Sequence, residues 1–165
     1  MTQFVLKNHL DPQAVCLRVK APNADAVIGV LADRLAAIGV VAQTWKAAAI
    51  AREAAMPTGL PLADDFAVAV PHTDPEHVLR AGLAVATLET PVAFRSMDDP
   101  DATVPARVVF AIALRDKHAQ IDMLQTIAGL LQSPEQLRRM ASAKDSDEFF
   151  AALDQALEPI GGGEQ

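Results

Sequence analysis

The feature that most constrains the fold is a short apolar run that ends in proline and histidine. Residues 65–75 read Asp-Phe-Ala-Val-Ala-Val-Pro-His-Thr-Asp-Pro. A continuous apolar run of this length predicts a strand that is buried on both faces of an α/β sheet. Pro71 fixes its own φ and favours an extended Val70, so the backbone that carries His72 is stiff. Since ligands bind at the carboxyl ends of strands in such sheets, His72 is the first candidate for chemistry.

Composition and charge limit the class of protein. The chain has 165 residues and 51% of them are apolar, which predicts a single domain over residues 1–165 with a sizeable core. We expect that core at about 14–158 and a frayed tail at 159–165. The chain carries 14 basic and 21 acidic side chains, a net charge of -7. This balance argues against nucleic acid or an anionic membrane surface as the main partner.

Cysteine content and hydropathy bear on where the protein works. Cys16 is the single cysteine, so neither an intrachain disulfide nor a cysteine-based metal site is expected. The amino terminus lacks the basic and apolar regions of a signal peptide, and no apolar run approaches the roughly 20 residues of a membrane-spanning helix. We therefore expect a cytoplasmic protein.

The first third of the chain predicts one strand and two helices. Residues 14–20 alternate apolar and polar side chains, which predicts a half-buried edge strand with one face toward water. Asn23 or Asp25 can cap the helix that follows, and Gly39 suits the left-handed residue that ends it. A second helix, rich in alanine, is expected over about 41–54.

The remainder predicts two more strands and three helices. Residues 81–88 predict a strand that stops before Pro91, and residues 98–101 predict a solvated loop. Residues 106–114 are almost continuously apolar, as in a central strand, and a helix over about 118–132 precedes two short ones. Because strands alternate with helices of about ten residues or more, we expect a three-layer α/β/α sandwich with a mixed, mostly parallel sheet.

These elements and residues together resemble the enzyme IIA domain of the phosphoenolpyruvate-dependent sugar phosphotransferase system, in the fructose and mannitol superfamily. The residues that carry the resemblance are Arg52-Glu53, Thr58-Gly59, the run 67–72, and His118 followed by Ile121, Leu124 and Leu131. Within the family, the sequences at 70–78 and 117–124 are most similar to the galactitol branch. Many fructose and mannitol members have glycine where this chain has Thr73, so their substrate class is not carried over.

The resemblance implies a phosphotransferase that acts as a phosphocarrier. His72 would accept a phosphoryl group from the carrier protein HPr and pass it to a cysteine of a cognate enzyme IIB, with the membrane component IIC involved only indirectly. Neutral imidazole is a nucleophile near neutral pH, and reversible transfer requires neither a metal ion nor another cofactor. The sequence has no glycine-rich nucleotide loop, so donor and acceptor are both expected to be proteins.

The resemblance also implies roles for residues around His72. His118, at a helix start, would stabilise the phosphoryl group or orient His72, because a helix start offers amide donors and a positive dipole end. Arg52 would add positive charge near the site. Thr58 fits either a turn or a hydrogen bond near His72, and it is assigned together with Thr73 to substrate binding.

Other interpretations of these residues stay open. His118 fits a helix-flanking residue. The Arg52-Glu53 pair fits an exposed helix end, and for Arg52 this interpretation fits as well as a role in the site. In one alternative function, phosphorylation of His72 switches partner binding in a regulatory, nitrogen-type IIA protein. In another, His72, His77 and His118 bind the metal ion of a hydrolase. The galactitol-like sequence favours sugar transport over both.

Overall fold

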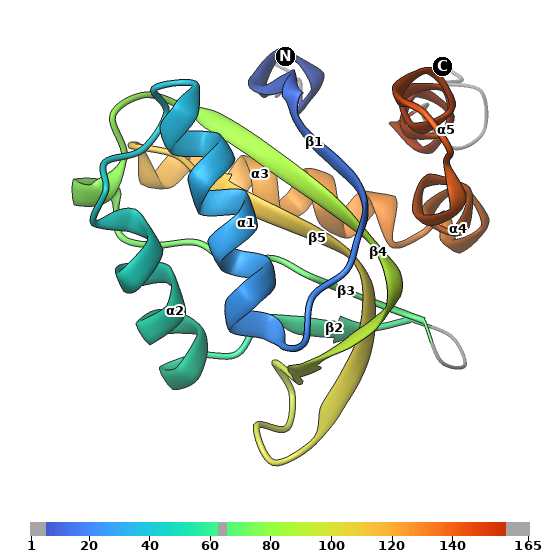
Figure 1. Cartoon of the computed structure of the whole chain (residues 1–165), viewed down its shortest axis with the longest axis horizontal. Helices are drawn as coiled ribbons and strands as arrows, with labels where there is room; N and C mark the ends of the chain where they lie inside the picture. Colours follow the sequence, from blue (N-terminus) through green and yellow to red (C-terminus); the bar gives the residue numbers. More distant parts are fainter. Residues whose placement is uncertain (1–5, 63–65, 158–165) are drawn as a thin grey trace.

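A mixed sheet lies at the centre of the molecule (Figure 1). The computed structural model describes residues 6–62 and 66–157, so the predicted tail at 159–165 lies outside the described residues. The strands are β1 (Leu10–Val19), β2 (Gly59–Pro61), β3 (Ala67–Ala69), β4 (Gly82–Arg95) and β5 (Thr103–Ala113). Their order across the sheet is β1-β4-β5-β3-β2, and β1 pairs with β4, and β3 with β5, in parallel. The β2-β3 and β4-β5 pairs are antiparallel.

Helices cover both faces of this sheet, which confirms the three-layer α/β/α sandwich (Figure 1). The helices are α1 (Ala24–Ala37), α2 (Trp45–Ala55), α3 (Lys117–Leu130), α4 (Pro134–Ser142) and α5 (Ser146–Leu157), with short 3-10 helices η1 (Leu6–His9) and η2 (Pro75–His77). Successive side chains of β5 point to opposite faces of the sheet and so belong to two separate hydrophobic cores. Val109 and Ala111 pack with α1 and α2, whereas Val108 and Phe110 pack with α3, α4 and α5. No described helix has the length and apolarity needed to cross a membrane.

Local chemistry sets the ends of α1 and the start of α2. The Asn23 side chain accepts a hydrogen bond from a backbone N–H of the first turn at 2.9 Å, as a capping residue does. Gly39 has a φ of 77°, in the left-handed region that favours glycine. Both predictions are confirmed. The next helix starts at Trp45 and not near residue 41, because Val41 instead forms a β-bridge with Val78.

The prediction for β1 is correct in position, and its exposed side is predicted wrongly only at Cys16. The strand lies at the edge of the sheet, as expected. However, Cys16 is 6% exposed in the core formed with α1, and Val15 lies in the core formed with α4 and α5. Cys16, on the expected water-facing side, is therefore covered by α1, whereas Arg18 and Lys20 on the same side are exposed as predicted.

Strand β4 continues beyond the predicted stop at Pro91. It extends to Arg95 and forms a hairpin with β5, and residues 98–101 lie in the exposed loop as expected. The pairing register shifts between Thr87 and Val92. A shift of this kind leaves residues outside the regular ladder, where a proline without an N–H group is tolerated.

Strand β3 positions His72. Its residues and the flanking Phe66 and Val70 are buried, which confirms the predicted strand. Beyond β3 the chain stays beside β5, since the N–H of Ile112 donates to the carbonyl of Pro71 at 3.0 Å. The end of β5 thus holds the segment that presents His72.

Close approach of β2 to the β4-β5 hairpin requires a glycine. A Cβ atom at Gly59 would lie 2.6 Å from the carbonyl oxygen of Arg95 and 2.7 Å from a methyl group of Val104. The carbonyl of Gly59 also accepts a hydrogen bond of 2.8 Å from the N–H of Met97. Because the nearest atom to the added Cβ belongs to the backbone of Arg95, relief of the overlap requires a backbone shift that costs free energy.

We expect Gly59→Ala to lower the free energy of unfolding by about 1–3 kcal/mol, because the new methyl group overlaps backbone. Urea denaturation followed by circular dichroism would measure this. Gly129→Ala is the control: nothing lies within 4 Å of its added Cβ. Because α3 favours alanine over glycine, the control should gain about 0.5–1 kcal/mol. Equal stability of the two variants would contradict the close approach.

Candidate active site

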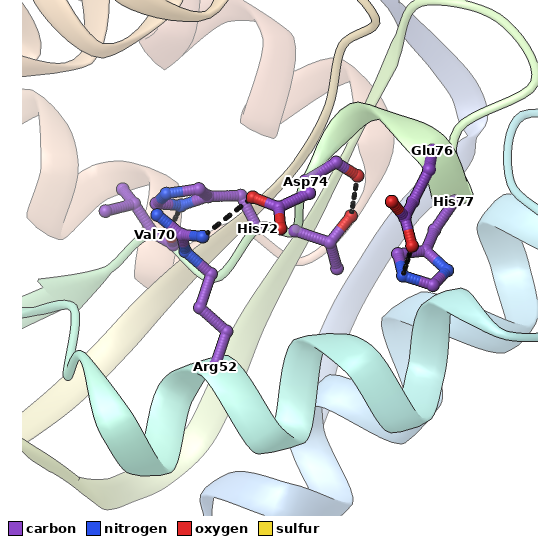
Figure 2. A network of polar contacts seen from close by, with 7 residues as sticks. Arg52, Val70, His72, Asp74, Glu76 and His77 are labelled. Carbon is purple, nitrogen blue, oxygen red and sulfur yellow. Dashed lines mark hydrogen bonds and ion pairs between the residues drawn. The ribbon is translucent and has the colours of Figure 1, made fainter.

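The side chain of His72 is held by the strand that precedes it. Its Nδ1 lies 2.8 Å from the carbonyl oxygen of Val70 (Figure 2). A carbonyl oxygen can only accept a hydrogen bond, so Nδ1 carries the hydrogen in the neutral ring. The lone pair therefore resides on Nε2, which makes Nε2 the nucleophilic atom of the site.

The surroundings of His72 favour the neutral ring. Burial lowers the pKa of His72, and the guanidinium of Arg52 lowers it further. The hydrogen bond to Val70 and the carboxylate of Asp74 act in the opposite direction without cancelling the effect of burial. A neutral imidazole near pH 7 is the form that attacks phosphorus.

Arg52 extends from α2 toward His72 and forms an ion pair with Asp74 (Figure 2). Nη1 of Arg52 lies 3.1 Å from Oδ1 of Asp74. The Asp74 side chain is 72% exposed, so the pair lies at the surface. Nε of Arg52 is buried and has no hydrogen-bond partner among the described residues. The guanidinium therefore keeps a free donor beside the ring of His72.

A buried carboxylate supports the backbone that holds His72. Glu53, the next residue of α2 after Arg52, is 7% exposed. Its two oxygens accept the backbone N–H and the hydroxyl of Thr58, each at 2.8 Å. The Thr58 hydroxyl in turn accepts the N–H of Val70 at 3.1 Å. Since the carbonyl of Val70 holds His72, a continuous series of hydrogen bonds joins α2 to the imidazole.

This series includes a residue that the sequence analysis did not assign to the site. Glu53 was considered with Arg52 in the family resemblance and as part of an exposed helix end, and its burial shows that the second interpretation is wrong for Glu53. Its place beside Arg52 on one helix was the available signal. Burial raises the pKa of the Glu53 carboxyl, while the hydrogen bonds from Thr58 and the charge of Arg95 oppose that rise. Thr58 itself is 3% exposed, and its hydroxyl is engaged on both sides.

The other predicted residues lie around the same edge of the sheet. Thr73 is buried, and its hydroxyl donates to the carbonyl of Asp74 at 2.8 Å. His118 is exposed in the first turn of α3, and the hydrogen bonds of the described residues include none between it and His72. A surface pocket of about 230 Å³ lies between the Arg52-Asp74 pair and α3, and its lining from α3 consists of Lys117, Gln120, Ile121 and Leu124 without His118. Thus α3 begins opposite the Arg52-Asp74 pair.

His77 belongs to a different set of contacts. Its Nδ1 lies 2.9 Å from the hydroxyl of Thr44, and its Nε2 lies 3.5 Å from a carboxylate oxygen of Glu76 (Figure 2). Over residues 6–62 and 66–157, no three His, Cys, Asp or Glu side chains are grouped closely enough to hold a metal ion. The metal-hydrolase alternative therefore has no support in the described part of the chain.

A neutral histidine beside an arginine at the edge of an α/β sheet suits a histidine phosphotransferase. The family model described as "Phosphoenolpyruvate-dependent sugar phosphotransferase system, EIIA 2" matches residues 8–156. The chain belongs to this family. It is a phosphocarrier of that system, and the resemblance found in the sequence is confirmed.

Individual relatives agree with this assignment. The galactitol-specific EIIA component of Escherichia coli K12 is 30% identical over 122 residues, which cover 73% of this chain and 80% of that protein. The 2-O-alpha-mannosyl-D-glycerate-specific EIIABC component of the same organism is 32% identical over 159 residues, 93% of this chain and 23% of the relative. Among solved structures, E. coli IIAMTL in its complex with phosphorylated IIBMTL has a TM-score of 0.71 at 24% identity, over 88% of this chain and 96% of that one.

We expect Thr58→Val to lower the free energy of unfolding by about 1–3 kcal/mol, because Glu53 and the N–H of Val70 each lose a buried partner. Urea denaturation measures the change. Thr103→Val, at an exposed position of β5, makes the same chemical change and should stay within about 0.5 kcal/mol of the wild type. Wild-type stability of Thr58→Val would argue against the hydrogen-bond series.

The titration of His72 should have its midpoint below 6.5, the ordinary value, with the hydrogen of the neutral ring on Nδ1. Long-range ¹H–¹⁵N NMR reports both. The unfolded chain then binds more protons than the folded one, so His72 reduces stability as pH falls through about 6.5 toward the folded pKa. The same chain in urea provides the reference. A midpoint above 6.5, or a hydrogen on Nε2, would refute this description of the ring.

Proposed function

We propose that His72 is the phosphoryl acceptor of this phosphocarrier and that Nε2 is the reacting atom. The observation that carries the proposal is the bond from Nδ1 to the Val70 carbonyl, which leaves the Nε2 lone pair free in a neutral ring. The position of Arg52 adds support, because its guanidinium can balance charge on the phosphoryl oxygens.

The transfer proceeds in two displacements at phosphorus. In the first, the Nε2 lone pair forms an N–P bond while the N–P bond of the donor phosphohistidine breaks. Nδ1 keeps its hydrogen, which it donates to the Val70 carbonyl throughout, so the phosphorylated ring is positively charged. In the second, a cysteine thiolate forms an S–P bond while the Nε2–P bond breaks, and neutral imidazole is the leaving group.

Other residues assist these steps. Arg52 binds the phosphoryl oxygens through guanidinium donors. We assign His118 to stabilisation of the phosphoryl group, supported by its exposed place at the amino-terminal end of α3. Thr73 contributes its backbone N–H, since its hydroxyl already donates to Asp74. Thr58 positions His72 and does not contact the substrate, because its hydroxyl is engaged by Glu53 and Val70.

The proposed partners are two proteins. The donor is HPr, and the acceptor is a cysteine of a cognate enzyme IIB, a choice supported by the complex of E. coli IIAMTL with phosphorylated IIBMTL. We propose a galactitol-like polyol as the transported sugar, because a galactitol-specific EIIA component is 30% identical. Both relatives are sugar-specific components, which favours transport over the regulatory alternative. We place the exchange in the cytoplasm, where the phosphoryl donors of the system act.

Intact-mass analysis after incubation with phosphoenolpyruvate, enzyme I and HPr tests this function. The wild type should gain one acid-labile phosphoryl group, and His72→Ala should gain none. His77→Ala is the matched control and should be phosphorylated like the wild type, because His77 contacts Thr44 and Glu76 outside the site. Circular dichroism verifies that each variant is folded. Phosphorylation of His72→Ala, or a wild type that takes up nothing from competent HPr, would disprove the proposal.

A further inference from the structure

Arg52 lies between two anions in the phosphorylated protein. One is the carboxylate of Asp74, which it contacts at 3.1 Å. The other is the phosphoryl group on Nε2 of His72, if His72 carries it as proposed. Asp74 and the bound phosphoryl group therefore both interact with the guanidinium of Arg52.

The backbone holds Asp74 close to His72. The two residues are separated by Thr73, which is buried and donates its hydroxyl to the carbonyl of Asp74. Asp74 is also the residue that opens the 3-10 helix η2, with Pro75 in its first turn. These contacts restrain the turn, so the backbone of Asp74 stays close to the site when the phosphoryl group arrives.

The charges make this proximity unfavourable for the phosphorylated state. A phosphoryl group brings about -1.5 to -2 charges at neutral pH. Asp74 is a fixed negative charge near it, and Arg52 can neutralise only part of the sum. Because Asp74 already engages the guanidinium, less of the positive charge of Arg52 is available to the phosphoryl group, so the aspartate weakens the binding of that group.

We propose that Asp74 is a positioning residue that keeps the phosphoryl group on His72 easy to transfer, by competing with it for Arg52. In the free protein, Asp74 holds the guanidinium beside the ring, ready for the incoming group. After transfer, the one guanidinium that balances Asp74 must also balance the phosphoryl oxygens, and that sharing reduces the net stabilisation of phosphohistidine. A phosphocarrier must release the phosphoryl group that it accepts, so a modest stability of phosphohistidine favours onward transfer. This inference rests on the proposed role of His72.

The test is the equilibrium constant for transfer between purified phospho-HPr and this chain, approached from both directions. Asp74→Asn should shift it toward the phosphorylated chain by about threefold to fivefold, as expected for an exposed charge pair. Glu76→Gln is the control. It removes the same charge two residues away, from a side chain that is 77% exposed and contacts His77 instead of Arg52. It should change the equilibrium by less than about twofold.

A second comparison shows whether Asp74 acts through Arg52. In an Arg52→Gln chain, Asp74→Asn should shift the equilibrium by less than about twofold, because the contested guanidinium is gone. A full shift in that background would mean direct repulsion and would overturn the positioning role, as would an Asp74→Asn equilibrium equal to that of the wild type. These outcomes are distinct from failure of the proposed function, in which even the wild type accepts no phosphoryl group from phospho-HPr.

Discussion

The hydrogen bond from His72 to the carbonyl of Val70 is the interaction on which the site depends. It decides which ring nitrogen is nucleophilic, and it does so through backbone, which no side-chain substitution at Val70 can remove. The orientation of the imidazole depends on the placement of β3, because the carbonyl that accepts its hydrogen bond directly follows this strand. The parallel pairing of β3 with β5 and the contact of Ile112 with Pro71 fix that carbonyl.

Helix α2 contributes two adjacent residues with separate tasks. Consecutive side chains on a helix point about 100° apart, so Arg52 can reach the surface while Glu53 turns inward. Arg52 supplies charge beside the ring, and Glu53 anchors Thr58, which supports the strand from within. The charge beside the imidazole and the orientation of the imidazole therefore both depend on the position of α2. A displacement of α2 would alter both together.

Features set by local chemistry were predictable from the sequence, and features set by long-range packing were not. Gly39 and the strand before His72 were placed correctly, because backbone conformation and hydrophobic run length act over a few residues. Cys16 was assigned to the wrong environment because its burial depends on the packing of α1 against β1, which alternation within the strand does not reveal. Pro91 was predicted to end the strand because the register shift that accommodates it depends on how β4 pairs with β5, which the sequence of one strand does not reveal. Glu53 was missed as a site residue because its partners lie on other elements.

The fixed hydrogen on Nδ1 frees the proposed exchange from proton transfer at His72. Neither displacement requires His72 to gain or lose a proton, since the ring enters and leaves the cycle with Nδ1 bonded to Val70. The transfer then needs neither a general base nor a proton channel. A site that exchanges a phosphoryl group without exchanging protons suits a molecule that accepts the group from one protein and donates it to another.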